Sequence, residues 1–162
     1  MSTKMMVWAA LLTALAIVIP MTFANIGLVI ILGPFTATLA SHVPVMISML
    51  LTPGFAFVVG LGSALGFLLI LGQVVAARAA MHAVVAATGS ILITQGMTFR
   101  KALLVTLPLH ALLESLVVLP FGYNLYQAVV VVGLGTALHH GIDMLIAVWV
   151  AKVISPLLPE NL

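Results

Sequence analysis

The sequence has no cysteine and very few charged residues. Without cysteine, disulfides and thiolate metal sites are excluded. Five Lys or Arg and three Asp or Glu among 162 residues give a net charge of +2, which is too small to indicate a nucleic-acid partner. A G-x-x-x-x-G-K-[ST] phosphate-binding loop is also missing, so the sequence predicts no nucleotide site in this chain.

What the sequence does contain is apolar. Hydrophobic residues make up 64% of the chain, and the mean hydropathy is +1.39. One soluble core cannot bury so many apolar side chains, so we expect an integral membrane protein. Lys4 and the apolar run after it resemble a signal peptide, but no clear small-residue cleavage site follows, and we interpret the run as a first membrane span.

Clusters of Pro, Gly and polar residues divide the chain into six segments near the length that a membrane span requires. The predicted spans are Met5–Met21, Phe35–Leu51, Phe55–Leu71, Val75–Thr94, Ala102–Leu119 and Tyr126–Val153. A break at residues 52–54 is needed because one helix over 35–71 would be about 55 Å long. Residues 22–34, which include Asn25, are too apolar for a solvent loop, and we expect them to fold back on the bundle. The predicted fold is all-α, with residues 1–162 forming one domain of six transmembrane helices.

The basic residues predict the orientation of this bundle. With six spans and a cytoplasmic N-terminus, Lys4, Arg100, Lys101 and Lys152 all lie on the cytoplasmic side, as does the C-terminus. Arg78 alone lies at the outer end of a span. It therefore needs an explanation other than topology.

Three spans carry ionisable residues four positions apart, which places each pair on one helix face. The pairs are Arg78 with His82, His110 with Glu114, and His139 with Asp143. Such residues are costly in lipid, so we expect all three faces to point inward, toward one site.

Each of these residues also has a structural interpretation. Arg78 would snorkel to the outer headgroups, or its planar fork of donors would hold a carboxylate and pair with Glu114 when the site is empty. His82, His110 and Glu114 would make interhelical hydrogen bonds only.

For the remaining intramembrane histidines we expect structural roles. His139 and Asp143 would form a local pair, and His140 points about 100° away from His139. His42, two residues before Pro44, would satisfy backbone groups.

Small residues mark two helix faces suited to close packing. Gly62 and Gly66 are expected to pack inside the bundle, whereas the strip around Ala10 and Ala14 suits contact with a different subunit.

In this order and spacing, the segments resemble the substrate-binding S components of energy-coupling factor (ECF) vitamin transporters. The segments that carry the resemblance are ALLTALAIVIP, ASHVPVMISMLLTP, GLGSALGFLL, RAAMH, HALLE and GLGTALHHGID, which together cover nearly the whole chain. The resemblance implies a multi-pass protein of the prokaryotic cell membrane that is not itself an enzyme and has no cofactor. It binds one small vitamin and docks on a transmembrane T component with two ABC-type ATPases, which bind ATP and Mg²⁺.

The resemblance also implies site residues. Ala10 and Ala14 map onto the strip that contacts the T component. The substrate pocket maps onto the first loop and the last three spans, with these residues: Asn25, Arg78, His82, His110, Glu114, Tyr123, Asn124 and Tyr126. An inward arginine favours a vitamin with a carboxylate, and Tyr123, Tyr126 or Phe35 would cover its apolar part. Pantothenate is preferred slightly over niacin, because Glu114 would bond a substrate hydroxyl.

Two other functional classes fit parts of the sequence. His110 and Glu114, with His139 or His42, would supply metal ligands for a small intramembrane hydrolase, although no H-E-x-x-H motif is present. A channel would require polar residues along its whole length, whereas here they gather toward the outer half.

Overall fold

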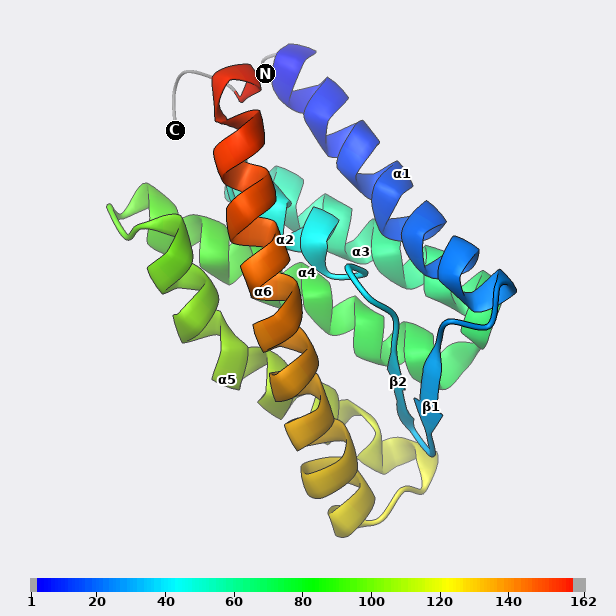
Figure 1. The fold of residues 1–162 in the computed structure, drawn as a ribbon. Coiled ribbons are helices and arrows are strands. Elements are labelled where there is room, and N and C mark those ends of the chain that lie inside the picture. The colour runs from blue at the N-terminus through cyan, green and yellow to red at the C-terminus, as the bar shows by residue number, and fades with distance from the viewer. Residues whose placement is uncertain (1–2, 159–162) are drawn as a thin grey trace.

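The computed structural model describes residues 3–158 and consists mainly of helices (Figure 1). The long helices are α1 (Thr3–Asn25), α3 (Pro53–Leu71), α4 (Gln73–Thr94), α5 (Phe99–Val117) and α6 (Gly135–Ile154). A π-helical segment, η2 (Gln127–Leu134), leads directly into α6, and short 3₁₀ turns lie at Leu119–Phe121 and Ser155–Leu157. Within the described residues, five helical segments are long and apolar enough to cross a membrane.

Helices α1 and α3 run in the same direction. Gly62 lies against Thr13 and Gly66 against Ile17, so both helices advance together, and the absence of side chains on the glycines allows this close contact. The prediction that these glycines pack inside the bundle is confirmed. Two parallel neighbours require the segment between them to bring the chain back across the bundle.

That returning segment is not the continuous helix predicted for residues 35–51. It consists of β1 (Ile30–Leu32), β2 (Phe35–Ala37), a turn, and the six-residue helix α2 (Val43–Ser48). Ala40 adopts a left-handed backbone with φ of 63°, which interrupts any helix at that residue. The backbone N–H groups of Ala40 and His42 donate to the Asp143 carboxylate, and Pro44 lies in the first turn of α2, where it has no need of an N–H.

The two strands form an antiparallel hairpin that folds back over the bundle. Leu32 pairs with Phe35 across a tight turn at Gly33, whose φ is 58°. Phe35 is buried among Val118, Ala128 and Val132, while all of β1 is exposed. The hairpin thus closes one end of the space between α4 and α6.

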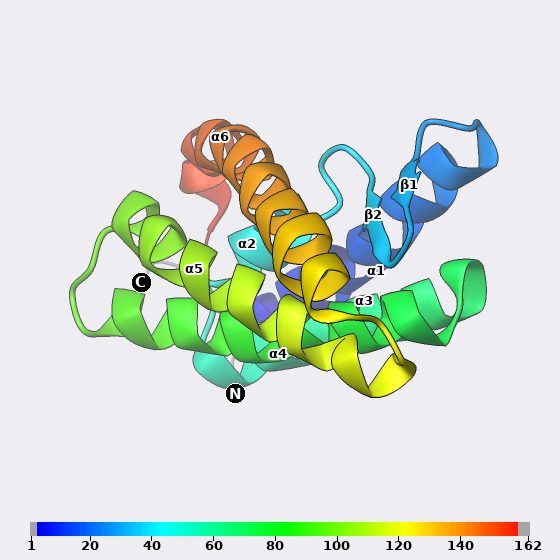
Figure 2. The ribbon, with the colours of Figure 1, turned by 90° about the horizontal axis from the view of Figure 1, so that it is seen from below.

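The short helix α2 lies in the middle of the bundle (Figure 2). It contacts α1, α3, α4 and α6, and all six of its residues are buried. Next to it, Met49 occupies the space beside Gly89 of α4, where a side chain would collide with it. This segment of the chain therefore forms the centre of the core instead of a lipid-facing span.

The start of α1 and the end of the described chain lie side by side (Figure 1). The Lys4 Nζ donates to the Leu158 carbonyl at 3.0 Å, and the Trp8 indole N–H donates to the Leu157 carbonyl at 3.3 Å. Both ends of the described chain therefore lie at one end of the bundle.

Candidate functional site

Glu114 of α5 lies at the centre of a buried polar cluster. Its side chain is 2% exposed, and its two carboxylate oxygens face different groups. Oε2 accepts hydrogen bonds from Arg78 Nη2 at 2.6 Å, from Arg78 Nε at 3.1 Å, and from the Thr136 hydroxyl at 2.6 Å. These charge-assisted bonds join α4, α5 and α6 at one carboxylate.

Arg78 lies inside the protein and does not reach toward headgroups, so the snorkelling interpretation is wrong. The residue is 4% exposed, and its Nη1 donates to the Pro34 carbonyl at 2.9 Å and contacts the Thr36 hydroxyl at 3.4 Å. The Phe35 ring centroid lies 5.3 Å from the guanidinium carbon, within cation–π range. The arginine thus ties the hairpin to the carboxylate at the centre of the cluster.

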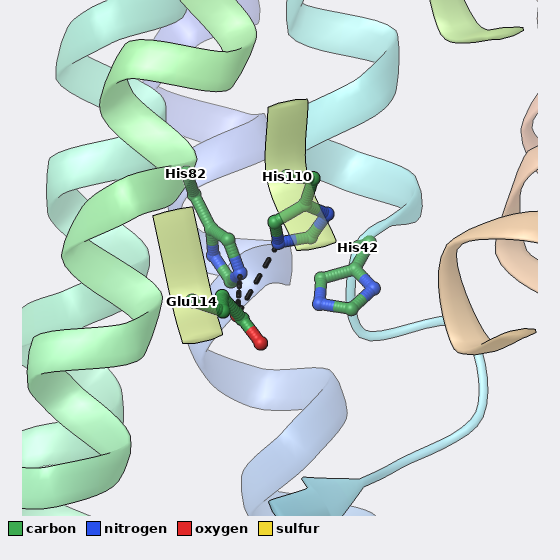
Figure 3. A group of neighbouring side chains, drawn as sticks. All are labelled: His42, His82, His110 and Glu114. Atoms are coloured by element: carbon green, nitrogen blue, oxygen red, sulfur yellow. Dashed lines mark hydrogen bonds and ion pairs between the residues drawn. The ribbon is translucent and has the colours of Figure 1, made fainter. Parts of the chain in front are cut away.

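Two imidazoles face the other oxygen of Glu114 (Figure 3). His110 Nε2 lies 3.2 Å and His82 Nε2 lies 3.4 Å from Oε1. On its other ring nitrogen, His82 contacts the Ser63 hydroxyl at 2.9 Å, and His110 contacts His140 Nδ1 at 3.0 Å. His140 in turn bonds the Leu103 carbonyl.

His42 joins this cluster instead of satisfying backbone groups with its ring. Its ring centroid lies 4.8 Å from that of His82 and 4.9 Å from that of His110, and its Nδ1 has no hydrogen-bond partner (Figure 3). The same Nδ1 is 3.3 Å from an Asp143 oxygen, but not in hydrogen-bonding geometry. The structure therefore does not support the backbone role expected for this ring.

A second carboxylate, Asp143 of α6, lies on the other side of His42. Its Oδ2 is 3.3 Å from His139 Nε2, so the predicted local pair is present. His139 also bonds the Thr38 carbonyl at 3.0 Å, whereas His140 faces α5. The two adjacent histidines therefore serve different neighbours, as their angular separation on the helix predicts.

Between these groups and the hairpin lies a small cavity of about 20 Å³. Its polar lining includes the hydroxyls of Thr36, Thr38 and Ser41 beside Arg78 and Glu114. Such a volume holds about one water molecule. A larger molecule therefore does not fit this cavity without a change in the structure around it.

The other predicted pocket residues lie apart from the cluster. Asn25 is exposed at the end of α1, and Tyr126 is 67% exposed. Asn124 and Gln127 hydrogen-bond each other's backbone N–H, and Tyr123 packs against the apolar group around Phe35. The four pocket residues predicted from RAAMH and HALLE, an arginine, two histidines and a carboxylate, meet, whereas the predicted loop residues do not join them.

Sequence reasoning missed Thr136 and the hairpin residues Pro34 and Thr36, and it named His42 only as an alternative metal ligand. Thr136 had a detectable signal, because positions 136, 139 and 143 share one helix face. The contact with the Pro34 carbonyl had none, since a backbone group carries no mark in the sequence.

The predicted docking strip lies on the outside of α1. Ala10 and Ala14 are exposed, while Ala9, Leu12 and Ala16 of the same helix are buried. The strip is therefore free to contact another protein.

Comparison with known proteins identifies a relative of nearly full length. Niacin transporter NiaX of Lactococcus lactis subsp. cremoris (strain MG1363) is 34% identical over 171 aligned positions, which cover 95% of this chain and 76% of the relative. No family model and no solved structure matches the chain. With this identity and coverage, and with apolar helices suited to a multi-pass protein of the cell membrane, the chain belongs to the S components of ECF vitamin transporters, in the niacin-transporter group.

Proposed function

We propose that this chain binds niacin, as the nicotinate anion, between the hairpin and helices α4–α6. The observation that carries the proposal is the buried guanidinium of Arg78, which lines the small polar cavity beside the hairpin. A guanidinium fork matches a carboxylate in geometry and charge. The niacin transporter at 34% identity supports this choice of ligand.

In this proposal, nicotinate replaces the contacts between Arg78 and the hairpin. Nη1 of Arg78 now donates to the Pro34 carbonyl and contacts Thr36, both of which belong to the hairpin. A ligand carboxylate would take that position once the hairpin moves outward, while Nε and Nη2 stay on Glu114. Phe35, already 5.3 Å from the guanidinium, would lie against the pyridine ring.

Niacin replaces pantothenate as the preferred ligand. The Glu114 carboxylate already accepts hydrogen bonds from Arg78 and Thr136 on Oε2 and lies against two imidazoles at Oε1, so the protein itself surrounds the group that was expected to hold a substrate hydroxyl. The cavity of about 20 Å³ also needs less enlargement for a single flat ring than for a long branched chain. The name of the relative supports the same ligand.

Titration of the purified protein with nicotinate, nicotinamide and pantothenate tests the proposal. Nicotinamide has the same ring but no anionic carboxylate, so we expect it to bind much more weakly than nicotinate. Replacing Arg78 with Ala should weaken nicotinate binding by about 2–5 kcal/mol, or at least about 30-fold. Equal binding of nicotinate and nicotinamide would overturn the role of Arg78, and preference for pantothenate would overturn the choice of vitamin.

A double variant separates loss of binding from loss of folding. Arg78→Met alone leaves the Glu114 charge buried without a partner, whereas Arg78→Met with Glu114→Gln removes both charges. We expect the double variant to keep its helical content and still fail to bind nicotinate.

We also propose that the loaded protein docks on a T component with two ATPases, which bind ATP and Mg²⁺ and drive import. Both termini would lie in the cytoplasm, with the hairpin at the outer face. The exposed strip at Ala10 and Ala14 would meet the T component.

Enlarging the strip tests the docking surface. Ala10→Leu or Ala14→Leu should leave nicotinate binding unchanged and lower cellular uptake, because the larger side chain separates the two helices. Leu15→Phe, which enlarges an exposed neighbour on α1, serves as the control. Normal uptake in both alanine variants would contradict this surface.

A further inference from the structure

We propose that His42, His82, His110 and Glu114 form a binding site for one divalent transition-metal ion, with Zn²⁺ the best match. Each of these buried residues offers one ligand atom, and the four atoms lie within 4.8 Å of one another (Figure 3). Three imidazoles and one carboxylate form a donor set suited to zinc. The site does not depend on the choice of vitamin.

The distances around Glu114 already approach those of a metal centre. Tetrahedral zinc with ligands at about 2.0–2.1 Å has donors about 3.3–3.4 Å apart. His110 Nε2 lies 3.2 Å and His82 Nε2 lies 3.4 Å from the same Glu114 oxygen. Two edges of the tetrahedron therefore already have the required length, and all four ligand atoms, that of His42 included, lie within 4.8 Å of one another.

The neighbours of His82 determine which of its nitrogens carries the hydrogen. The Ser63 hydroxyl donates its hydrogen to the Gly60 carbonyl at 2.7 Å, so its oxygen accepts from His82 Nδ1. The neutral ring then has a lone pair on Nε2, which is the nitrogen facing Glu114. This Nε2 is buried and has no hydrogen-bond partner.

His110 is oriented in the same way through a longer chain. His140 Nε2 donates to the Leu103 carbonyl at 3.0 Å. His140 is fully buried and hydrogen-bonds no carboxylate, so we take it as neutral, with an accepting Nδ1. His110 Nδ1 therefore donates to it, and His110 Nε2 lies at hydrogen-bonding distance, 3.2 Å, from Glu114 Oε1; in the neutral ring this Nε2 carries the lone pair that a metal ion would take.

With both imidazoles neutral, a nitrogen lone pair of each would face one carboxylate oxygen, and a positive ion between them would make this arrangement favourable; a hydrogen bond from His110 alone would still leave His82 Nε2 without a partner. A proton on Glu114 would serve one imidazole and not the other. Protonating both imidazoles would place three cations, with Arg78, around one buried carboxylate. One metal ion accepts both lone pairs and the carboxylate oxygen together, and metal-bound histidines donate their other N–H to neighbours in this way.

The second group of possible ligands, His42 with His139 and Asp143, lacks this feature. His139 Nε2 carries a hydrogen, because it bonds the Thr38 carbonyl. Each Asp143 oxygen already accepts a backbone N–H. His139 and Asp143 therefore have hydrogen-bond partners without a cation, only His42 Nδ1 of this group lacks one, and His139 is the matched control.

Metal content of the purified protein tests the site. The protein carries no polyhistidine tag, is free of nicotinate, and is incubated with Zn²⁺ or Co²⁺ before excess ion is removed. We expect one ion per chain and, with Co²⁺, the visible absorption of a tetrahedral centre. Protein that retains no Zn²⁺ and shows no such absorption with Co²⁺ would overturn the proposal.

Variants locate the bound ion. Glu114→Gln and His82→Gln should weaken Zn²⁺ binding by about 100-fold or more, and Ser63→Ala, which removes only the partner of His82, by about tenfold. His139→Gln should bind Zn²⁺ as the wild type does. Helical content and elution volume verify folding, and unchanged Zn²⁺ binding in folded Glu114→Gln and His82→Gln would overturn the assignment.

Discussion

Two buried carboxylates, Glu114 and Asp143, look alike in the sequence and differ in the structure. Each follows a histidine by four residues, in LHALLES and LHHGID, and each lies beside two imidazoles. Asp143 also accepts backbone N–H groups from Ala40 and His42 on its two oxygens. Glu114 receives side chains only.

This difference separates a structural carboxylate from a functional one. Backbone N–H groups hold their position as long as the fold exists, so Asp143 fixes the turn that leads into α2. Side chains such as Arg78 can exchange partners when a ligand arrives, so Glu114 sits in a group that can respond. The same spacing of residue types therefore serves two purposes, depending on what the backbone supplies.

The largest expected effect comes from removing the charge that faces Glu114. Arg78→Met should lower the free energy of unfolding by about 3–5 kcal/mol, because it leaves a buried carboxylate unpaired. Adding Glu114→Gln should restore most of the loss, and denaturant unfolding followed by tryptophan fluorescence measures both. No recovery in the double variant would show that Glu114, like Asp143, is held mainly by other contacts.

Removing Asp143 should cost somewhat less. Asp143→Ala leaves two buried N–H groups without acceptors and should lower the free energy of unfolding by about 3 kcal/mol. Proteolysis should then cut the segment around residue 40 more readily, since its turn loses its anchor. Asp143→Asn keeps one good acceptor, so its free energy of unfolding should lie between those of Asp143→Ala and the wild type. An unchanged free energy of unfolding in Asp143→Ala would contradict the difference between the two carboxylates.

The smallest effect tests the contact of Glu114 with α6. Thr136→Val removes a hydrogen bond to a charged group and should cost about 2 kcal/mol. Thr106→Val is the matched control, since that buried hydroxyl bonds only carbonyls of its own helix and should matter less. If both variants lost the same free energy of unfolding, the bond to Glu114 would contribute no more to stability than a hydroxyl bond within one helix.

Much of this fold follows from local signals. Runs of apolar residues interrupted by Gly, Pro and polar residues predicted the five long helices to within a few residues, because length and hydropathy alone define a membrane-crossing helix. The predicted helix at 35–51 was wrong for a physical reason. That segment is apolar because it forms the centre of the protein core, and an apolar run does not distinguish protein from lipid as its surroundings.

The site, like the fold, was predicted from the sequence only in part. Pairs four residues apart predicted that Arg78, His82, His110 and Glu114 face one another, because helical periodicity fixes the face of each residue. The position of His42 beside His82 and His110 was not predicted, because its direction depends on the turn at Ala40, which Asp143 holds from a hundred residues away. Asn25, Asn124 and Tyr126 were expected in the pocket from loop positions, where no periodicity fixes direction.

The sequence by itself determined that this chain lies in a membrane, where its long helices begin and end, and which charged residues turn inward. These features follow from hydropathy and from the helical repeat, both of which act over short stretches of chain. Only the tertiary structure decided that the second passage is a hairpin with a short helix, and that Glu114 is held by side chains alone while Asp143 is also held by backbone N–H groups. Those outcomes depend on contacts between distant residues, where small differences in packing and hydrogen bonding select one arrangement.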